Sequence, residues 1–319
     1  MQHINISTNF RDIIVRTNYQ IIIAILCVVV LPKTLIAKIH IFACEPEWAA
    51  LSEEIGGDKV SVFSATSAKQ DPHYIRAKPS LIARMRKSDL LIGSGGGLEI
   101  GWLPVLLKKS GNASIQPGKP GYLMAAEVVS LIERPETVDR SHGDVHPEGN
   151  PHRHLHPDNI IAVAKELSER LAEIDNDSEA YYRSRCVIFL EEWTDATAKW
   201  ALSATALKGM PVVVHHTSFA YLENWLGLKR ILTLEPKPGL PPTAAHLESS
   251  LKLLRSNPGR VILRSPYDLE KASLWLSKKT DIPAIELPYT VGGCDDCDDL
   301  YSLYDRTLAL LNKAYNGEL

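Results

Sequence analysis

The sequence predicts an α/β protein of two lobes, each with a mainly parallel sheet flanked by helices, joined by one long helix. Three observations support this prediction. Short apolar strands alternate with helical patterns in the first half, the same alternation returns in the last third, and one unbroken helical pattern lies between them. Such alternation is typical of βαβ units with parallel strands. The predicted boundaries are 1–37 for a signal peptide, 38–175 for the first lobe, 176–209 for the bridging helix and 210–319 for the second lobe.

The elements of the first lobe follow from local patterns. The alternating segment KIHIFA predicts a strand, and Pro46 and the pair Gly56-Gly57 predict the start and end of the helix after it. The apolar run LLIG predicts a buried strand. Predicted strands occupy 38–43, 60–64 and 90–93, with strand character around 122–132, and predicted helices occupy 46–55, 79–88, 101–109 and 157–174.

The bridging helix is predicted from aromatic and apolar residues that recur every three or four positions between Ser178 and Leu207. At about 1.5 Å per residue it would exceed roughly 40 Å, which is long enough to connect two lobes. After it, strands are predicted at 211–214, 230–234, 261–264 and 284–287, and helices at 219–226, 243–255, 268–279 and 300–312.

The composition is that of an ordinary globular protein. The 319 residues are 45% hydrophobic and 23% charged, with a formal net charge of -3. That balance gives no reason to expect nucleic acid as a partner, and we expect a monomer.

The N-terminus predicts export from the cytoplasm. Arg11 and Arg16 precede an apolar run at 21–31, which is about half the length that a membrane-spanning helix needs. This pattern predicts a signal peptide cleaved near Ala37, and hence a periplasmic or otherwise extracytoplasmic protein. An uncleaved membrane anchor is the alternative. In an oxidising compartment, the CxxC of Cys294 and Cys297 predicts a local disulfide.

Histidine is concentrated in one segment, since five of the eleven histidines lie between residues 142 and 156. The prolines and glycine of the same segment exclude a regular helix, so a loop is predicted. Imidazole is the commonest protein metal ligand, although His142 and His146 taken singly fit a polar loop equally well. The members of the cluster are His142, His146, His152, His154 and His156.

Two further histidines lie where predicted strands end. His73 is on the loop after the second strand, and His216 directly follows the strand at 211–214. Ligands of open α/β sheets bind beyond the carboxyl ends of strands, so these residues can meet His152 between the lobes. Three neutral imidazoles and one oxygen ligand form the tetrahedral site that zinc prefers. Adjacent residues at a strand end point in opposite directions, so either His215 or His216 could face this site.

The glycine-rich run GSGGG at 93–97 could cradle a phosphate. It lacks the GxGxxG fingerprint and the Lys-Ser/Thr of a P-loop. A tight turn is therefore the predicted role.

Three motifs together resemble the zinc/manganese solute-binding proteins of bacterial ABC importers: DPHYIRAKPS at 71–80, NPH at 150–152 and VVVHHTSFAYL at 212–222. The resemblance covers the chain from Lys38 nearly to its end. It implies a binding protein and no enzyme, with two lobes bridged by a long helix and a membrane permease as partner. The implied metal ligands are His73, His152 and His216, and the histidine-rich segment resembles a mobile loop that captures metal.

The fourth ligand departs from the family pattern, which implies an Asp or Glu after one of the last strands. That loop reads LPYTVGGCDDCDD at 287–299. Asp295 is preferred over Asp296 as the fourth ligand, and a water molecule is the alternative. Three histidines without a fixed second carboxylate favour Zn²⁺ over Mn²⁺ as the ion carried.

Two other functions fit the same residues. In an extended segment, His152, His154 and His156 would share one face, which would suit a secreted zinc-dependent hydrolase. Its general base would be one of three loop carboxylates, but no HExxH motif is present. A periplasmic metal chaperone without a transporter is the other alternative. The candidate bases are Asp144, Glu148 and Asp158.

Overall fold

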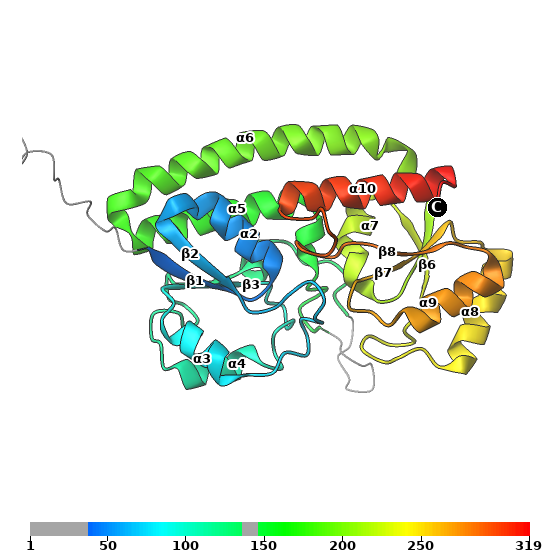
Figure 1. Ribbon diagram of the computed structural model, residues 1–319, viewed down its shortest axis with the longest axis horizontal. Coiled ribbons are helices and arrows are strands. Elements are labelled where there is room, and N and C mark those ends of the chain that lie inside the picture. The colour runs from blue at the N-terminus through cyan, green and yellow to red at the C-terminus, as the bar shows by residue number, and fades with distance from the viewer. Residues whose placement is uncertain (1–37, 136–145) are drawn as a thin grey trace, which may run out of the picture. The chain divides into compact units, whose positions relative to one another are not determined.

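The computed structural model describes residues 38–135 and 146–319 (Figure 1). The predicted signal peptide and the positions of His142 and Asp144 lie outside the described residues. Within the described ranges, no helix combines the length and the apolar character needed to cross a membrane.

The first sheet is fully parallel, with strand order β2-β1-β3-β4. Each strand except the last agrees with its predicted position to within one residue. The expected strand at 122–132 is only three residues long, because the chain turns into a 3₁₀ helix at Ala125–Glu127, where the amide of Ala126 donates to the carbonyl of Ser94. The elements are β1 Ile39–Ala43, α2 Pro46–Gly56, β2 Val60–Ser64, α3 Pro79–Arg86, β3 Leu90–Gly93, α4 Leu103–Ser110, β4 Tyr122–Met124 and α5 Pro157–Ile174.

The second sheet repeats this topology. Its order is β6-β5-β7-β8, and all its strand pairs are parallel. In both sheets, therefore, the loops after the strands open at one edge. The elements are β5 Pro211–Val214, α7 Ala220–Leu226, β6 Lys229–Thr233, α8 Ala244–Ser256, β7 Val261–Arg264, α9 Glu270–Thr280, β8 Ala284–Glu286 and α10 Leu300–Asn316.

Helix α6, Glu179–Ser203, connects the two sheets (green in Figure 1). Its 25 residues span about 37 Å. Near its start, the Arg185 side chain donates to the backbone carbonyl of Glu54 at the end of α2. Near its end, the indole of Trp200 donates to Asp305 of α10 at 2.6 Å. The predicted two-lobe α/β fold with one long helix is confirmed.

The largest of three apolar clusters runs through both halves, and the two smaller ones each belong to one sheet. The largest cluster extends from the strands of the first sheet through one face of α5 and α6 into the strands of the second sheet and α10. Trp193 of α6 is fully buried in it, and Trp200 stacks on Tyr304 with ring centroids 4.7 Å apart. The two sheets are therefore joined by packing as well as by the chain.

Candidate metal centre

Three separate loops bring His73, His152 and His216 together. His73 lies between β2 and α3, His152 precedes the 3₁₀ turn Arg153–Leu155, and His216 follows β5. One ring nitrogen from each lies within 4.8 Å of the other two. Residues far apart in sequence thus form one compact cluster, two of them buried and His73 nearly so.

The spacing within this cluster suits a tetrahedral ion. The Nε2 atoms of His152 and His216 are 3.4 Å apart. With zinc–nitrogen bonds of about 2.0–2.1 Å, two ligands of a tetrahedral ion lie about 3.3–3.4 Å apart. The ring of His73 is close to both, with centroid distances of 5.3 Å to His152 and 5.8 Å to His216.

An oxygen atom holds the Nδ1 of each histidine. The partners are Asp71 for His73, the Tyr289 hydroxyl for His152 and Glu235 for His216, each at 2.7 Å. A carboxylate only accepts hydrogen bonds, so His73 and His216 carry their proton on Nδ1 when neutral. Their Nε2 lone pairs are then directed to the middle of the cluster. In metal sites, hydrogen-bond partners of the ligand histidines commonly fix the ring orientation in this way.

The position of Glu235 follows from the register of the second sheet. Val214 of β5 pairs with Thr233 of β6, so two residues later His216 and Glu235 are level with each other. The amide of Gly239 donates to the same carboxylate at 2.9 Å. Asp71 is fixed locally, because it accepts the backbone N–H of His73 as well as the ring N–H.

Burial and neighbouring charges shift the pKa values of His152 and His216 in opposite directions. Burial lowers the pKa of His152 well below its ordinary value, and the surrounding histidines lower it further. Burial also opposes protonation of His216, but the hydrogen bond and charge of Glu235 outweigh it, so the pKa of His216 is raised. Burial favours protonation of Asp71, but its contact with His73 outweighs this and lowers the pKa. His152 is therefore neutral, as a metal ligand must be.

His146 also reaches the cluster. Its Nε2 atom lies 3.2 Å from the Nε2 of His73, and the two rings are 5.3 Å apart. The glycine-rich turn makes room for it, because a Cβ on Gly97 would lie 3.1 Å from the Nδ1 of His146. His146 is near only one side of the cluster, since its ring centroid is 6.4 Å from that of His152.

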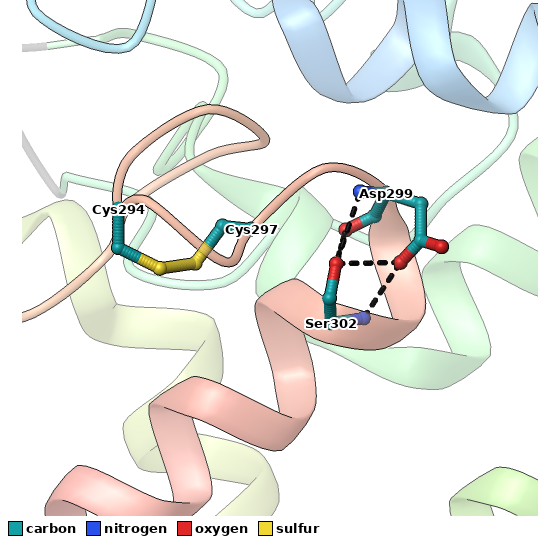
Figure 2. The surroundings of a disulfide bond; sticks show 4 residues. All are labelled: Cys294, Cys297, Asp299 and Ser302. Atoms are coloured by element: carbon teal, nitrogen blue, oxygen red, sulfur yellow. Dashed lines mark hydrogen bonds between the residues drawn. A yellow bond between two sulfur atoms is a disulfide. The ribbon is translucent and has the colours of Figure 1, made fainter.

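Asp295 does not join the histidines. It is exposed on the loop closed by the Cys294–Cys297 disulfide, which confirms the predicted local bridge (Figure 2). Among the described residues, the group of potential ligands around His73 includes no carboxylate from this loop. The acidic residue with a defined role there is Asp299, which caps the N-terminus of α10 through Ser302 (Figure 2).

The expectation that His152, His154 and His156 share one face is wrong, because the backbone forms a 3₁₀ turn there. The ring of His154 lies between Glu47, at 3.1 Å, and the carbonyl of Tyr289, at 2.6 Å. His156 caps α5 by accepting the amide of Asp158. The arrangement required for an HxHxH hydrolase site is therefore not formed.

A second group of potential ligands lies away from the histidines. Cys44, Glu45 and Glu99 are buried, and one ligand atom of each lies within 4.8 Å of the others. The Glu99 carboxylate accepts hydrogen bonds from the backbone amides of Ser94 and Gly95, so it stabilises the glycine-rich turn. Burial raises the pKa values of Glu45 and Glu99. Burial therefore favours the protonated form of both carboxyl groups.

Comparison with known proteins gives one family. Residues 41–314 match the model described as zinc-uptake complex component A, periplasmic (ZnuA). The manganese ABC transporter substrate-binding lipoprotein scaA of Streptococcus gordonii is 24% identical over 284 residues, covering 88% of this chain and 89% of that protein. The zinc-binding lipoprotein AdcA of Streptococcus pneumoniae is 22% identical over 210 residues, covering 65% of this chain and 41% of AdcA.

Solved structures have the same fold. A crystal structure of ZnuA superposes with a TM-score of 0.70 at 21% identity, covering 86% of this chain and 98% of that one. A zinc-bound ZnuA deletion mutant gives a TM-score of 0.72 at 21% identity, covering 88% and 97%. Since the family match spans nearly all of the described fold, the chain belongs to the ZnuA family of metal-binding ABC transporter substrate-binding proteins.

Proposed function

We propose that this protein binds Zn²⁺ through His73, His152 and His216 and delivers it to the permease of an ABC importer. The main support for this proposal is that ring nitrogens of the three histidines lie close together. The Nδ1 atoms of His73 and His216 are hydrogen-bonded to carboxylates, which leaves their Nε2 atoms for a metal ion. Neutral imidazoles held in this way direct lone pairs at one another, which is unfavourable until a cation lies between them. The donor set therefore fits a metal ion as cargo.

The ligand chemistry favours zinc over manganese. Imidazole nitrogen suits zinc, whereas manganese prefers carboxylate, carbonyl and water oxygen. The two nearest carboxylates, Asp71 and Glu235, are occupied in holding His73 and His216. The relatives include proteins named for either metal, so the preference for zinc rests on the donor atoms of this chain.

For the fourth ligand we propose His146 in place of Asp295. The 3.2 Å between His146 and His73 matches an edge of the same tetrahedron, and the 3.4 Å between His152 and His216 matches the opposite edge. A small movement of the His146 side chain would bring its Nε2 to about 2.0–2.1 Å from an ion bound by the other three histidines. The site would then hold zinc with four imidazoles.

The proposed location is outside the cytoplasm. The matched family is described as periplasmic, and several relatives are named as lipoproteins. The predicted signal peptide agrees with this location, and the disulfide between Cys294 and Cys297 suits an oxidising compartment.

The test is metal analysis of the purified mature protein, followed by competition titrations with zinc, manganese and copper. We expect one tightly bound zinc per chain and weaker binding of manganese. His216→Ala should weaken zinc binding far more than His142→Ala, which removes a histidine of the histidine-rich segment 142–156. Equal effects of the two substitutions would contradict the ligand assignment, and tighter binding of manganese would contradict the metal.

A further inference from the structure

A cavity of about 510 Å³ opens beside the metal centre on the side of the second sheet. Its inner wall carries three carboxylates, Asp71, Glu235 and Asp268, together with the ring of His215. Its outer wall is apolar apart from Lys271 and includes Trp275 of α9.

This cavity adjoins the histidines through a narrow chamber. A space of about 30 Å³ is lined by His73 and His216 and also by Asp268 and Tyr267. Asp71, Glu235, Tyr267 and Asp268 line both spaces, so the larger cavity and the metal centre share one acidic wall.

The charge of this wall suits a cation. No described lysine or arginine forms an ion pair with Asp71, Glu235 or Asp268, and the cavity lining contains a single lysine, Lys271. His215 is buried, with 5% of its surface exposed, and its Nδ1 has no hydrogen-bond partner among the described residues. The carboxylates of this wall can therefore accept hydrogen bonds from the water molecules around an incoming ion.

The two spaces differ in size. The larger cavity, at about 510 Å³, accommodates a hydrated divalent ion, whereas the inner chamber measures about 30 Å³. An ion that binds the histidines exchanges part of its water for the imidazoles of His73 and His216.

We propose that this acidic cavity is a binding site for hydrated divalent cations and the route by which they reach the histidines, with Asp268 as the residue that attracts them. The proposal rests on the proposed zinc binding. Asp71 and Glu235 also hold ligand histidines, whereas Asp268 is bound to the backbone amide of Ser265 at 2.7 Å. Asp268 can therefore be neutralised without removing a partner of His73 or His216.

A second opening provides the competing route. A cavity of about 470 Å³ is lined by His73, Gly97, His146 and Glu148. It carries one carboxylate, compared with three on the acidic wall. Electrostatic attraction therefore favours the route past Asp268.

The test is stopped-flow measurement of zinc association with the mature protein at low and high salt. Asp268→Asn should slow association roughly three- to tenfold at low salt, with a smaller effect at high salt, because screening weakens the attraction. Lys271→Gln should accelerate association, a gain that a folding defect cannot produce. Asp296→Asn, which removes the same charge from the exposed disulfide loop, is the matched control and should leave the rate unchanged.

The outcomes separate this proposal from the proposed function. If wild type binds zinc through His216 but Asp268→Asn and Lys271→Gln associate at the wild-type rate, the acidic route is refuted. Slower association in Glu148→Gln alone would assign the route to the opening beside His146. If wild type binds no zinc, the proposed function itself fails.

Discussion

The Nε2 atoms of His152 and His216 lie 3.4 Å apart, although 64 positions separate the two residues in sequence. His152 follows the first sheet and His216 follows strand β5 of the second, so their contact lies where the two halves of the fold meet. The Nδ1 of His152 is hydrogen-bonded to Tyr289, and the Nδ1 of His216 to Glu235. We therefore expect substitutions of these partners to affect metal binding as well.

Glu235→Ala should weaken zinc binding about 10- to 100-fold, because His216 loses the carboxylate that fixes its tautomer and orientation. Asp295→Ala serves as the control and should leave the affinity unchanged, because Asp295 lies on the exposed loop. Competition titration with a chromophoric chelator measures both. A loss of affinity in Asp295→Ala comparable to that in Glu235→Ala would restore Asp295 as a ligand.

Zinc affinity should fall as the pH falls, and the decline should begin above the ordinary histidine pKa. Glu235 raises the pKa of His216, so His216 gains its proton at a higher pH than a free histidine, and zinc must displace that proton. His152 has a lowered pKa and stays neutral over this range. With one proton displaced, affinity should drop about tenfold per pH unit below the pKa of His216.

Titrations between about pH 5.5 and 8 measure this slope, around the ordinary histidine value of about 6.5. In Glu235→Ala the decline should move to lower pH, because the group that raises the pKa of His216 is gone. Affinity that is independent of pH over the whole range would contradict proton competition at His216.

His146→Ala should lower zinc affinity roughly tenfold or more and reduce the number of imidazoles on the ion from four to three. X-ray absorption of the zinc-loaded protein counts the imidazole ligands directly. His246→Ala removes a histidine of α8 that contacts the carbonyl of Thr233, and it is the control for loss of one imidazole. Four imidazoles in both variants would exclude His146 from the site.

Zinc should stabilise the folded protein. A ligand present at about 1,000 times its dissociation constant adds about 4 kcal/mol to the free energy of unfolding when it binds only the native state. The midpoint of thermal unfolding should therefore rise with zinc and return after EDTA treatment. His216→Ala should show little of this rise, and an equal rise in the variant would indicate that zinc binds elsewhere.

Much of the fold could be predicted because local patterns and tertiary packing agree. The unbroken periodicity before Gly209 predicted α6, and strands such as LLIG lie where the apolar runs placed them. The segment after Met124 could not be predicted as a turn, because its strand-like composition is overridden by the contact between Ala126 and Ser94. The choice between extended and turned backbone there depends on a distant loop.

The site was only partly predictable for a similar reason. His73, His152 and His216 belong to recognisable motifs, whereas Tyr289 and His146 approach them only through tertiary packing. Glu235 had a usable signal, since adjacent parallel strands β5 and β6 place it level with His216. Asp71 was visible two residues before His73, but its role depends on a hydrogen bond that sequence alone does not specify.

Helix α6 also constrains how the cargo is released. It is bound to Glu54 at one end and to Asp305 at the other, and one apolar core continues beneath it through both sheets. Swinging the halves widely apart would expose that core to water, at a large cost in free energy. We therefore expect a bound ion to be released through movement of the loops that carry the histidines, and not through wide separation of the two halves.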